Sequence, residues 1–255
     1  MPLSRHARDL HLVRTSADGS LRFVAKTELP TAYGRLTVYG FEETESGQEH
    51  LALVAGGIDG ERRIDVRIHS ECLTGEVLGS LKCDCRQQLE AALRRIGRRG
   101  GIVLYLRQEG RGIGLLNKLK AYALQEQGHD TVQANHLLGF ADDLRSYASA
   151  VAMLRFLGVS KVRLLTNNPT KVRAIEDAGL DVVRKPHQQA SNPHNARYLI
   201  TKAKKSGHLL RLARIGWSDG QPHGGSDHAR TESVEVPRAR RCAGHTPRRG
   251  AGGVS

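Results

Sequence analysis

The sequence predicts a mixed α+β (or mixed α/β) fold, and three observations support this class. Between residues 21 and 68, short runs rich in Val, Ile, Leu and aromatic residues are separated by Gly, Pro and acidic turns. From about residue 85 to residue 210, apolar residues that recur with a helical period alternate with short buried runs. After residue 215, Gly, Pro, Ser, His and Arg dominate. We therefore expect an N-terminal antiparallel β region, then βαβ-type units, then a disordered C-terminal tail.

The N-terminal β region is predicted from four strand-like runs. They cover residues 21–24, 35–39, 50–54 and 64–68. Because turn residues separate them, we expect the runs to pair as antiparallel neighbours. A polar, irregular segment at residues 1–20 precedes them.

The second part of the chain alternates between two periods. Its first helix has apolar residues at i, i+3, i+4 and i+7 from Leu89 to Ile96, and it ends at Gly100-Gly101. The next elements are a strand at 102–106, helices around 115–123 and 149–157, a strand at 162–165, a helix that begins at Asn168-Pro169, a strand at 180–183 and a helix at about 195–210. This alternation is typical of parallel βαβ units.

The expected organisation is therefore an irregular segment at 1–20, one domain at 21–210 and a basic tail at 211–255. The formal net charge is +13. The tail contains eight arginines and four acidic residues, which leaves +9 on the rest of the chain. A basic domain fits an anionic ligand such as a nucleotide, and this charge alone does not exclude nucleic acid.

No apolar run is long enough to cross a bilayer, and the first residues lack the apolar block of a signal peptide. We therefore expect a soluble, cytoplasmic protein without membrane contact. In that compartment cysteines are more often metal ligands or incidental core residues than disulfides.

The strongest local signal is the motif Cys72-x10-Cys83-x-Cys85. Three thiols this close can hold a zinc ion and leave one tetrahedral position for water, which is the arrangement of a catalytic site. The alternative is three buried thiols without a metal. Cys242 lies in the predicted tail and is not counted as a ligand. Because three thiolates would make the site negative, it should need cations or an acid from the helices that follow.

Two strand-to-helix turns offer anion-binding features. The turn at 107–114 is rich in glycine and contains Arg107 and Arg111, so its backbone amides can approach a phosphate. The turn at 166–171 adds a second amide cluster and Lys171. Each turn also has a purely structural interpretation, the first as a glycine-rich βα turn and the second as an N-cap followed by Pro169.

Taken together, these segments resemble the GTP cyclohydrolase II family. The matching stretches are His69-Ser70-Glu71-Cys72-Leu73-Thr74-Gly75, Leu81-Lys82-Cys83-Asp84-Cys85, Arg107-Gln108-Glu109-Gly110-Arg111-Gly112-Ile113-Gly114-Leu115, Lys120-Ala121-Tyr122-Ala123-Leu124-Gln125, Leu165-Thr166-Asn167-Asn168-Pro169 and Leu29-Pro30-Thr31. The likeness extends from about residue 26 to residue 210. Several motifs in the right order are far more specific than any one of them.

The resemblance implies an activity. GTP and water would give formate, pyrophosphate and 2,5-diamino-6-(5-phospho-ribosylamino)pyrimidin-4(3H)-one, the first committed step of riboflavin biosynthesis. It also implies one Zn²⁺ per subunit, Mg²⁺ with the triphosphate, and a homodimer. A metal-activated water would attack C8 of guanine twice, first opening the ring and then releasing formate.

The family's site residues carry over by position. The zinc ligands would be Cys72, Cys83 and Cys85. The GTP contacts would be Arg67, Ile68, His69, Ser70, Glu71, Gln88, Glu109, Gly110, Arg111, Thr131, Thr166 and Lys171. Asp143 falls at the position of the proton acceptor, and Arg145 at that of the group that attacks the α-phosphorus. Asp142 shifts the local match by one, but only Asp143 keeps the Asp-x-Arg spacing.

Elementary chemistry supports most of these roles. Tyr122 can donate a proton to the developing charge, or it can be a core aromatic on a helical stripe. Glu109 can accept hydrogen bonds from the N–H edge of guanine, and Arg111 and Lys171 can hold phosphates. For Arg145, covalent attack would need desolvation and a base. Electrostatic stabilisation of the α-phosphate is an equally open role, and a plain surface ion pair is the structural alternative.

Two other functions remain open at this point. A specialised paralogue would stop at the formamide or serve another pathway, and the presence of Tyr122 argues mildly for the full reaction. A non-catalytic zinc module that binds nucleic acid would need a fourth zinc ligand and exposed aromatic residues. With three clustered cysteines and 4% aromatic residues, the sequence disfavours that module.

Overall fold

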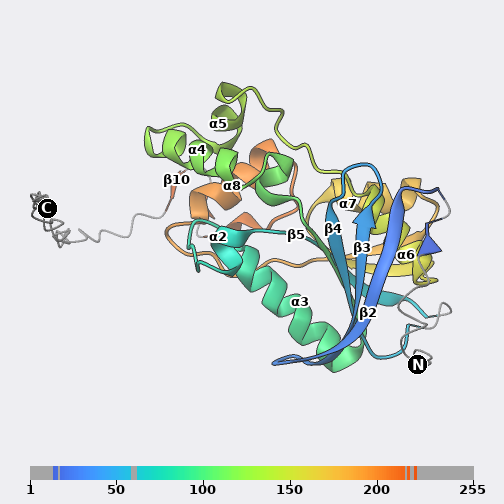
Figure 1. Cartoon of the computed structure of the whole chain (residues 1–255). Coiled ribbons are helices and arrows are strands. Elements are labelled where there is room, and N and C mark those ends of the chain that lie inside the picture. The colour runs from blue at the N-terminus through green and yellow to red at the C-terminus, as the bar shows by residue number, and fades with distance from the viewer. Residues whose placement is uncertain (1–13, 17, 59–61, 216, 219–220, 223–255) are drawn as a thin grey trace, which may run out of the picture. The chain divides into compact units, whose positions relative to one another are not determined.

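The computed structural model describes residues 14–222 except 17, 59–61, 216, 219 and 220. The described chain (Figure 1) forms an eight-stranded sheet, and its strand order is β1-β2-β3-β4-β6-β5-β7-β8. The strands are β1 (Arg14–Thr15), β2 (Leu21–Thr31), β3 (Gly34–Glu43), β4 (Glu49–Ala55), β5 (Ile64–Ser70), β6 (Gly101–Leu106), β7 (Lys161–Leu165) and β8 (Asp181–Lys185). The predicted mixed fold is confirmed.

The first half of the sheet is antiparallel, as expected. β1 to β4 pair in sequence order, and β4 then pairs antiparallel with β6. The β2–β3 hairpin turns through two residues, and its tip lies against Gly97 of α3 (Cys85–Arg99). A Cβ at Gly97 would come within 2.0 Å of the Tyr33 carbonyl oxygen, so only glycine fits this contact.

The second half is parallel, and this corrects one prediction. The run at 64–68 was expected in the antiparallel region, but β5 pairs parallel with both β6 and β7. Nearly every residue of β5 is buried, whereas β2 and β4 have exposed faces. A strand covered on both sides and followed by a crossover helix is typical of a parallel position.

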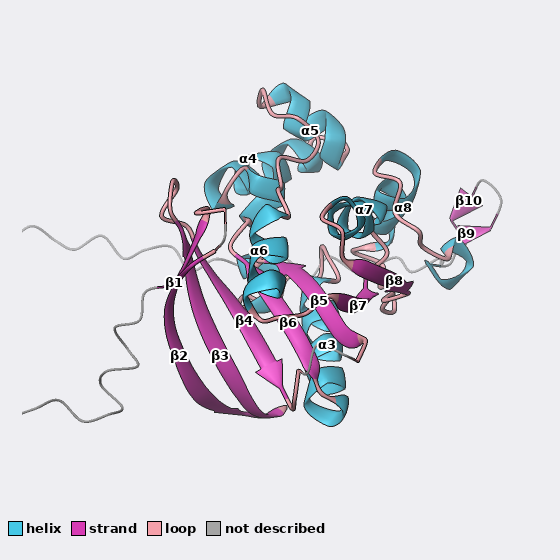
Figure 2. Cartoon of the chain, turned by 90° about the vertical axis from the view of Figure 1, so that its right-hand side faces the viewer, coloured by secondary structure: helices cyan, strands magenta, loops and turns pink. Residues whose placement is uncertain are grey.

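Helices cover both faces of the sheet (Figure 2). On one face α3 packs over a small cluster, namely Leu36, Ala55, Ala92, Ile96 and Val103. On the other face α6 (Ala148–Phe156) and α7 (Pro169–Asp177) pack over the larger core, which includes Val66, Leu104, Met153 and Leu164. As predicted, Asn168 caps α7 by accepting a hydrogen bond from the Thr170 amide (2.9 Å).

The remaining helices gather near the ends of β5, β6 and β7 (Figure 1). They are α2 (Leu73–Glu76), the 3-10 helix η2 (Glu109–Gly112), α4 (Leu115–Glu126), α5 (Thr131–Leu137) and α8 (Ala196–Lys205). Helices α2 and α5 were not predicted, because both are too short to show a period. α8 ends earlier than expected since Gly207 has a positive φ of 64° directly after its C-cap.

The predicted flanking segments lie largely outside the described residues. At the N-terminal side, β1 falls within the segment that we expected to be irregular. At the C-terminal side, the 3-10 helix η3 (Leu212–Ile215) and the short strands β9 (Trp217–Ser218) and β10 (Gln221–Pro222) fall within the segment expected to be disordered. Across the described ranges, none of the helices is both long and apolar enough to span a membrane.

Candidate functional site

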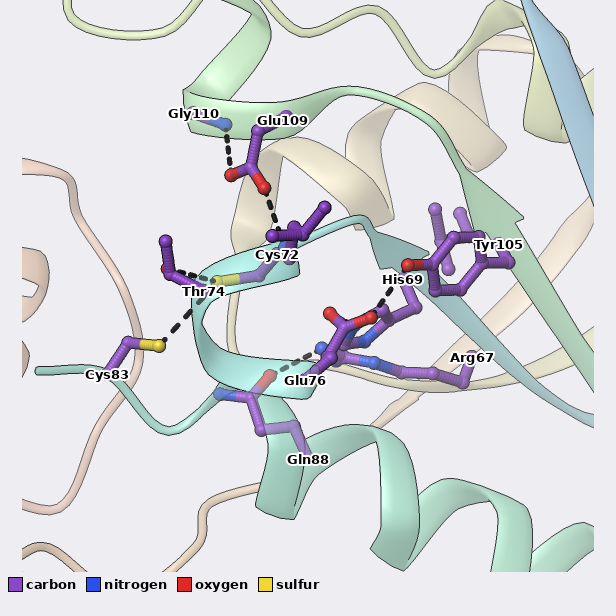
Figure 3. A network of polar contacts seen from close by, with 12 residues as sticks. Arg67, His69, Cys72, Thr74, Glu76, Cys83, Gln88, Tyr105, Glu109 and Gly110 are labelled. Atoms are coloured by element: carbon purple, nitrogen blue, oxygen red, sulfur yellow. Dashed lines mark hydrogen bonds and ion pairs between the residues drawn. The ribbon is translucent and has the colours of Figure 1, made fainter. Parts of the chain in front are cut away.

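Three cysteines form what we call the thiol cluster: Cys72, Cys83 and Cys85. Cys72 follows β5 and precedes α2, while Cys85 begins α3. All three sulfur atoms lie within 4.8 Å of one another, and the Cys72 and Cys83 Sγ atoms are 3.7 Å apart (Figure 3). Two thiolates bound tetrahedrally to zinc at about 2.3 Å are separated by about 3.8 Å, so the spacing fits such a metal ion.

The surroundings of the thiol cluster favour one thiolate, at Cys72, whereas hydrogen bonds among the cysteines and burial raise the pKa of Cys83 and of Cys85. Hydrogen bonds from Cys83 and Cys85, aided by Lys118, hold the pKa of Cys72 far below its ordinary value. Gly75 of α2 packs directly against the sulfurs, and a Cβ there would lie 2.8 Å from Cys83 Sγ. Helix α2 thus closes the cluster on one side without a side chain.

Helix α4 supplies the cation that the negative cluster requires. Lys118 is 9% exposed, and its Nζ donates to Cys72 Sγ at 3.1 Å and to Glu109 Oε1 at 2.7 Å. Tyr122, one turn further along α4, also lines the pocket. Burial raises the pKa of Tyr122 to about 12, so its hydroxyl remains protonated at neutral pH.

The Glu109 carboxylate is already occupied by protein donors. Its Oε2 accepts from the Leu73 amide (2.6 Å), and its Oε1 accepts from the Gly110 amide at 2.8 Å (Figure 3). Oε1 also accepts from Lys118. These contacts let Glu109 shape the turn, and its predicted role at the N–H edge of guanine stays a prediction.

Beside the cysteines, a buried network holds His69. Glu76 Oε1 lies 2.7 Å from His69 Nε2, and its Oε2 accepts from the Tyr105 hydroxyl at 2.7 Å (Figure 3). The His69 and Tyr105 rings also stack, with centroids 5.7 Å apart. Burial outweighs the carboxylate and lowers the pKa of His69. The imidazole is therefore neutral at pH 7, with Nε2 as donor.

The same pocket carries four cations, which we call the cation cluster: Arg67, Arg145, Lys171 and Lys202. Arg67 and Lys171 are buried, and Arg145 and Lys202 are partly buried. Arg67 donates to the Leu165 carbonyl (2.9 Å) and to the Gln88 side chain, and Lys171 donates to the Ile68 carbonyl (2.9 Å). Among the interactions of the described residues, Arg67 and Lys171 have no salt bridge to a carboxylate. Burial, with Arg67 and Arg145 nearby, lowers the pKa of Lys171 well below its ordinary value.

Arg145 and Lys202 do lie near carboxylates. Arg145 makes a two-pronged pair with Asp143 at 2.8 and 2.5 Å. Burial alone would lower the pKa of Arg145, but the hydrogen bonds from this guanidinium to Asp143 raise it, so Arg145 stays charged. The Lys202 Nζ is 3.5 Å from Asp84 Oδ1 and lies over the Tyr198 ring. The cluster thus keeps an excess of positive charge.

One pocket joins the two clusters, and most predicted residues line it. They are Arg67, His69, Ser70, Glu71, Gln88, Glu109, Gly110, Arg111, Tyr122, Thr131, Arg145, Thr166 and Lys171, together with the three cysteines. Two predicted residues, Ile68 and Asp143, do not line the pocket. The Ile68 side chain lies in the hydrophobic core and only its carbonyl serves the site, while Asp143 stands behind Arg145.

Sequence reasoning missed several lining residues. They are Lys118, Asp84, His187, Tyr198, Lys202 and His208. For α8 a signal did exist, because Tyr198 and Lys202 are four residues apart and therefore share a helix face. For the two histidines, which lie in segments without a period, the sequence contained no comparable signal.

A sheet of this topology, with clustered thiols and several cations in one pocket, defines a mixed α/β protein able to hold a metal ion and an anion. The model of the family GTP cyclohydrolase II matches residues 22–186. GTP cyclohydrolase-2 of Shewanella amazonensis is 53% identical over 193 residues, covering 75% of this chain and 94% of the relative. GTP cyclohydrolase-2 of Escherichia coli O9:H4 (strain HS) is 56% identical over 192 residues, covering 74% and 98%.

The chain belongs to the GTP cyclohydrolase II family. The predicted family and enzyme class are thereby confirmed. Among solved structures, RibBX, a two-domain 3,4-dihydroxy-2-butanone 4-phosphate synthase from A. baumannii, aligns with a TM-score of 0.43 and 19% identity, covering 68% of this chain and 42% of that one.

Proposed function

We propose that this protein is a zinc-dependent GTP cyclohydrolase II. It would convert GTP and water to formate, pyrophosphate and 2,5-diamino-6-(5-phospho-ribosylamino)pyrimidin-4(3H)-one in the first committed step of riboflavin biosynthesis. The observation that carries the proposal is the placement of the thiol cluster and the cation cluster in one pocket of a member of this family.

The cysteines fit the metal that the proposal requires. Their spacing matches tetrahedral thiolate coordination, and hydrogen bonds from the neighbouring cysteines lower the pKa of Cys72, which favours the thiolate that binds a metal ion. Cys72, Cys83 and Cys85 would hold the zinc ion, which when bound supplies a Lewis acid that activates water at neutral pH.

The cation cluster supports binding of the triphosphate. Arg67 and Lys171 are buried charges whose protein partners are neutral, an arrangement that an anionic ligand stabilises. Arg111 adds a further guanidinium from the 107–114 turn. Mg²⁺ would accompany the triphosphate, as it does for phosphate substrates generally. The guanine ring then extends toward the cysteines.

Tyr122 is the proposed proton donor. It lies in the same pocket as the thiol cluster, and its raised pKa keeps the hydroxyl protonated. In this role it would donate a proton to the ring nitrogen as the bond to C8 breaks. This placement supports the full reaction over a paralogue that stops at the formamide.

For Arg145 the geometry supports electrostatic stabilisation of the α-phosphate. Its guanidinium is held in the charged form by both oxygens of Asp143. A charged guanidinium stabilises negative charge well and is a poor nucleophile. Covalent attack would require Asp143 to remove a proton from this group first, which the raised pKa of Arg145 opposes.

We also propose a cytoplasmic homodimer. Large apolar side chains are exposed next to the site, including Val77 (74%), Leu78 (70%) and Leu116 (73%), and such side chains favour burial between subunits. Size-exclusion chromatography of the full-length protein with light-scattering detection should give twice the 27.9 kDa mass of the chain.

The test is product analysis with the full-length protein. GTP, Mg²⁺ and Zn²⁺ are supplied, and formate, pyrophosphate and the pyrimidine are quantified for wild type, Cys83→Ser and the matched control Cys242→Ser. Equal formate and pyrophosphate, with formate lost only in Cys83→Ser, supports the proposal. Pyrophosphate without formate in the wild type would replace it with the stalled reaction. No turnover by zinc-loaded protein would overturn it.

A further inference from the structure

Lys118 occupies a position to which the proposed chemistry gives no role. It lies on α4, far from Cys72 in sequence, yet its ammonium contacts both Cys72 Sγ (3.1 Å) and Glu109 Oε1 (2.7 Å). Its side chain is 11% exposed, so the charge is almost fully removed from water. A buried ammonium is stable only where such partners compensate the loss of hydration.

These contacts close a ring between two segments of the site. Lys118 binds Glu109, Glu109 accepts from the Leu73 amide at 2.6 Å, and Leu73 directly follows Cys72, whose sulfur returns to Lys118. The ring therefore fixes the thiol cluster relative to the 107–114 turn. Without Lys118, the hydrogen bond between Leu73 and Glu109 would be the one remaining link of this ring between the two segments.

The backbone of the turn is shaped around the lysine stem. Gly110 and Arg111 both have left-handed φ angles, 63° and 62°. A Cβ at Gly110 would lie 3.1 Å from the Lys118 Cβ, so a larger residue would push the lysine away. A non-glycine residue such as Arg111 in this conformation costs free energy, and surrounding contacts must hold it there.

The positive charge of Lys118 also acts on the metal site through the contact with the Cys72 sulfur. Three thiolates around a divalent ion leave a net negative site, and the nearby Glu109 adds another negative charge. A cation that donates a hydrogen bond to a ligand sulfur withdraws electron density from it. Groups in contact with metal ligands tune the metal in this way.

We propose that Lys118 is a positioning residue that compensates the charge of the thiol cluster and fixes Cys72 against the 107–114 turn. The inference rests on the proposed function, because it assumes a metal ion at the three cysteines. It predicts that Lys118 controls both how tightly this metal is held and how strongly the sulfurs donate to it.

The experiment compares Lys118→Met, which keeps length and removes charge, with Lys118→Arg, which keeps the charge. Lys120→Met, on the exposed side of the same helix, is the matched control. Each full-length variant is examined for zinc affinity by competition with a chelator, for the thiolate-to-metal charge-transfer band after cobalt substitution, and for kcat and KM with GTP.

For Lys118→Met we expect zinc affinity and kcat to fall by roughly 10- to 100-fold, with a smaller change in KM. Its cobalt band should move to longer wavelength, since a sulfur without its hydrogen bond donates electrons more readily. Lys118→Arg should restore the band and part of kcat, and Lys120→Met should match the wild type. If Lys118→Met lacks a cooperative thermal transition, Lys118→Gln replaces it, with a shift in the same direction.

Two results would overturn the inference alone. One is a zinc-loaded, active wild type beside a Lys118→Met variant with unchanged affinity and band position. The other is Lys118→Arg behaving like Lys118→Met, which would show that the charge is irrelevant. Wild-type protein that binds no zinc, or that releases no formate, would instead overturn the proposed function itself.

Discussion

The thiol cluster and the cation cluster balance their charges in different ways. At the thiol end, a sulfur that carries negative charge is paired with Lys118, a cation of the protein itself. At the cation end, Arg67 and Lys171 are paired with carbonyl and amide oxygens, which neutralise no charge. The first end is prepared to receive a metal ion, and the second an anion. A substrate with a purine at one end and phosphates at the other would be oriented by this polarity.

The two ends also come from different parts of the fold. The cysteines lie within one short segment that runs from the end of β5 to the first residue of α3, so their spacing is set locally. The cations come from β5, from the start of α7, from the segment before α6 and from α8, so their meeting depends on the packing of the sheet and its helices. Two contacts join them, because Lys202 lies 3.5 Å from Asp84 Oδ1 and Arg67 donates to Gln88 of α3. Changes away from these two contacts should leave the other cluster largely intact.

Metal removal should have the largest effect and tests this independence. Protein dialysed against a chelator should lose formate release by more than about 100-fold, because no activated water remains. Calorimetry should still detect GTP binding by the same protein, and added zinc should restore turnover. Loss of GTP binding together with the metal would show that the thiol cluster and the cation cluster do not act independently.

The substitution Lys171→Met should show the reverse pattern. Removing one charge-assisted hydrogen bond to phosphate should raise the Kd for GTP by roughly 10- to 100-fold in zinc-free protein. The zinc content should not change. Arg173→Met, on the exposed side of the same helix, serves as the control and should bind GTP normally. An unchanged Kd for Lys171→Met would remove this lysine from the binding site.

Tyr105→Phe tests the buried network beside the cysteines. The Tyr105 hydroxyl donates to a buried carboxylate, so its loss should lower the free energy of unfolding by about 1.5–3 kcal/mol. The stacked ring remains, which limits other changes. Urea unfolding measures the effect, with Tyr33→Phe at the hairpin tip as the control. Equal stability of both variants would show that the hydrogen bond from Tyr105 to Glu76 does not stabilise the fold.

The smallest expected effect concerns pH. Because burial lowers the pKa of Lys171, the unfolded chain binds its proton more readily than the folded protein does. Lys171 therefore makes stability rise with pH between its lowered pKa and the ordinary value of about 10.4. Ligand-free Lys171→Met should lack this rise, so the difference in unfolding free energy between the two proteins should change with pH over this range. If the free energies of unfolding of the two proteins depended on pH in the same way, burial would not lower the pKa of Lys171.

Much of this fold was predictable because most of its elements have a clear period. α3 was found from its apolar face, and α7 from Asn168-Pro169. The run at 64–68 was placed wrongly because a strand's direction depends on which strands become its neighbours. In this sheet the neighbours are β6 and β7, which follow much later in the chain. Local pattern does not contain that information.

The site residues also differ in how far the sequence could predict them. The cysteines and the two strand-to-helix turns were found because each is a compact motif. Lys118 and Lys202 were missed because they act through packing across long stretches of sequence. Glu109 was found as a site residue, but its partners became visible only when Leu73 was placed beside it. Residue types predicted the chemistry, and tertiary contacts decided which groups are occupied.

The position of β6 has a consequence for the order of folding. This strand pairs antiparallel with β4 on one edge and parallel with β5 on the other, so it joins the two halves of the sheet. During synthesis the β2–β3–β4 meander can form from local contacts as soon as it emerges. β5 has no neighbour until β6 has been made, and Lys171 cannot enter the pocket until β7 has docked on β5. Pairing between strands far apart in sequence is slow. The newly made chain must therefore expose the apolar face of the β2–β3–β4 meander until β5, β6 and β7 have paired and the cation cluster is complete.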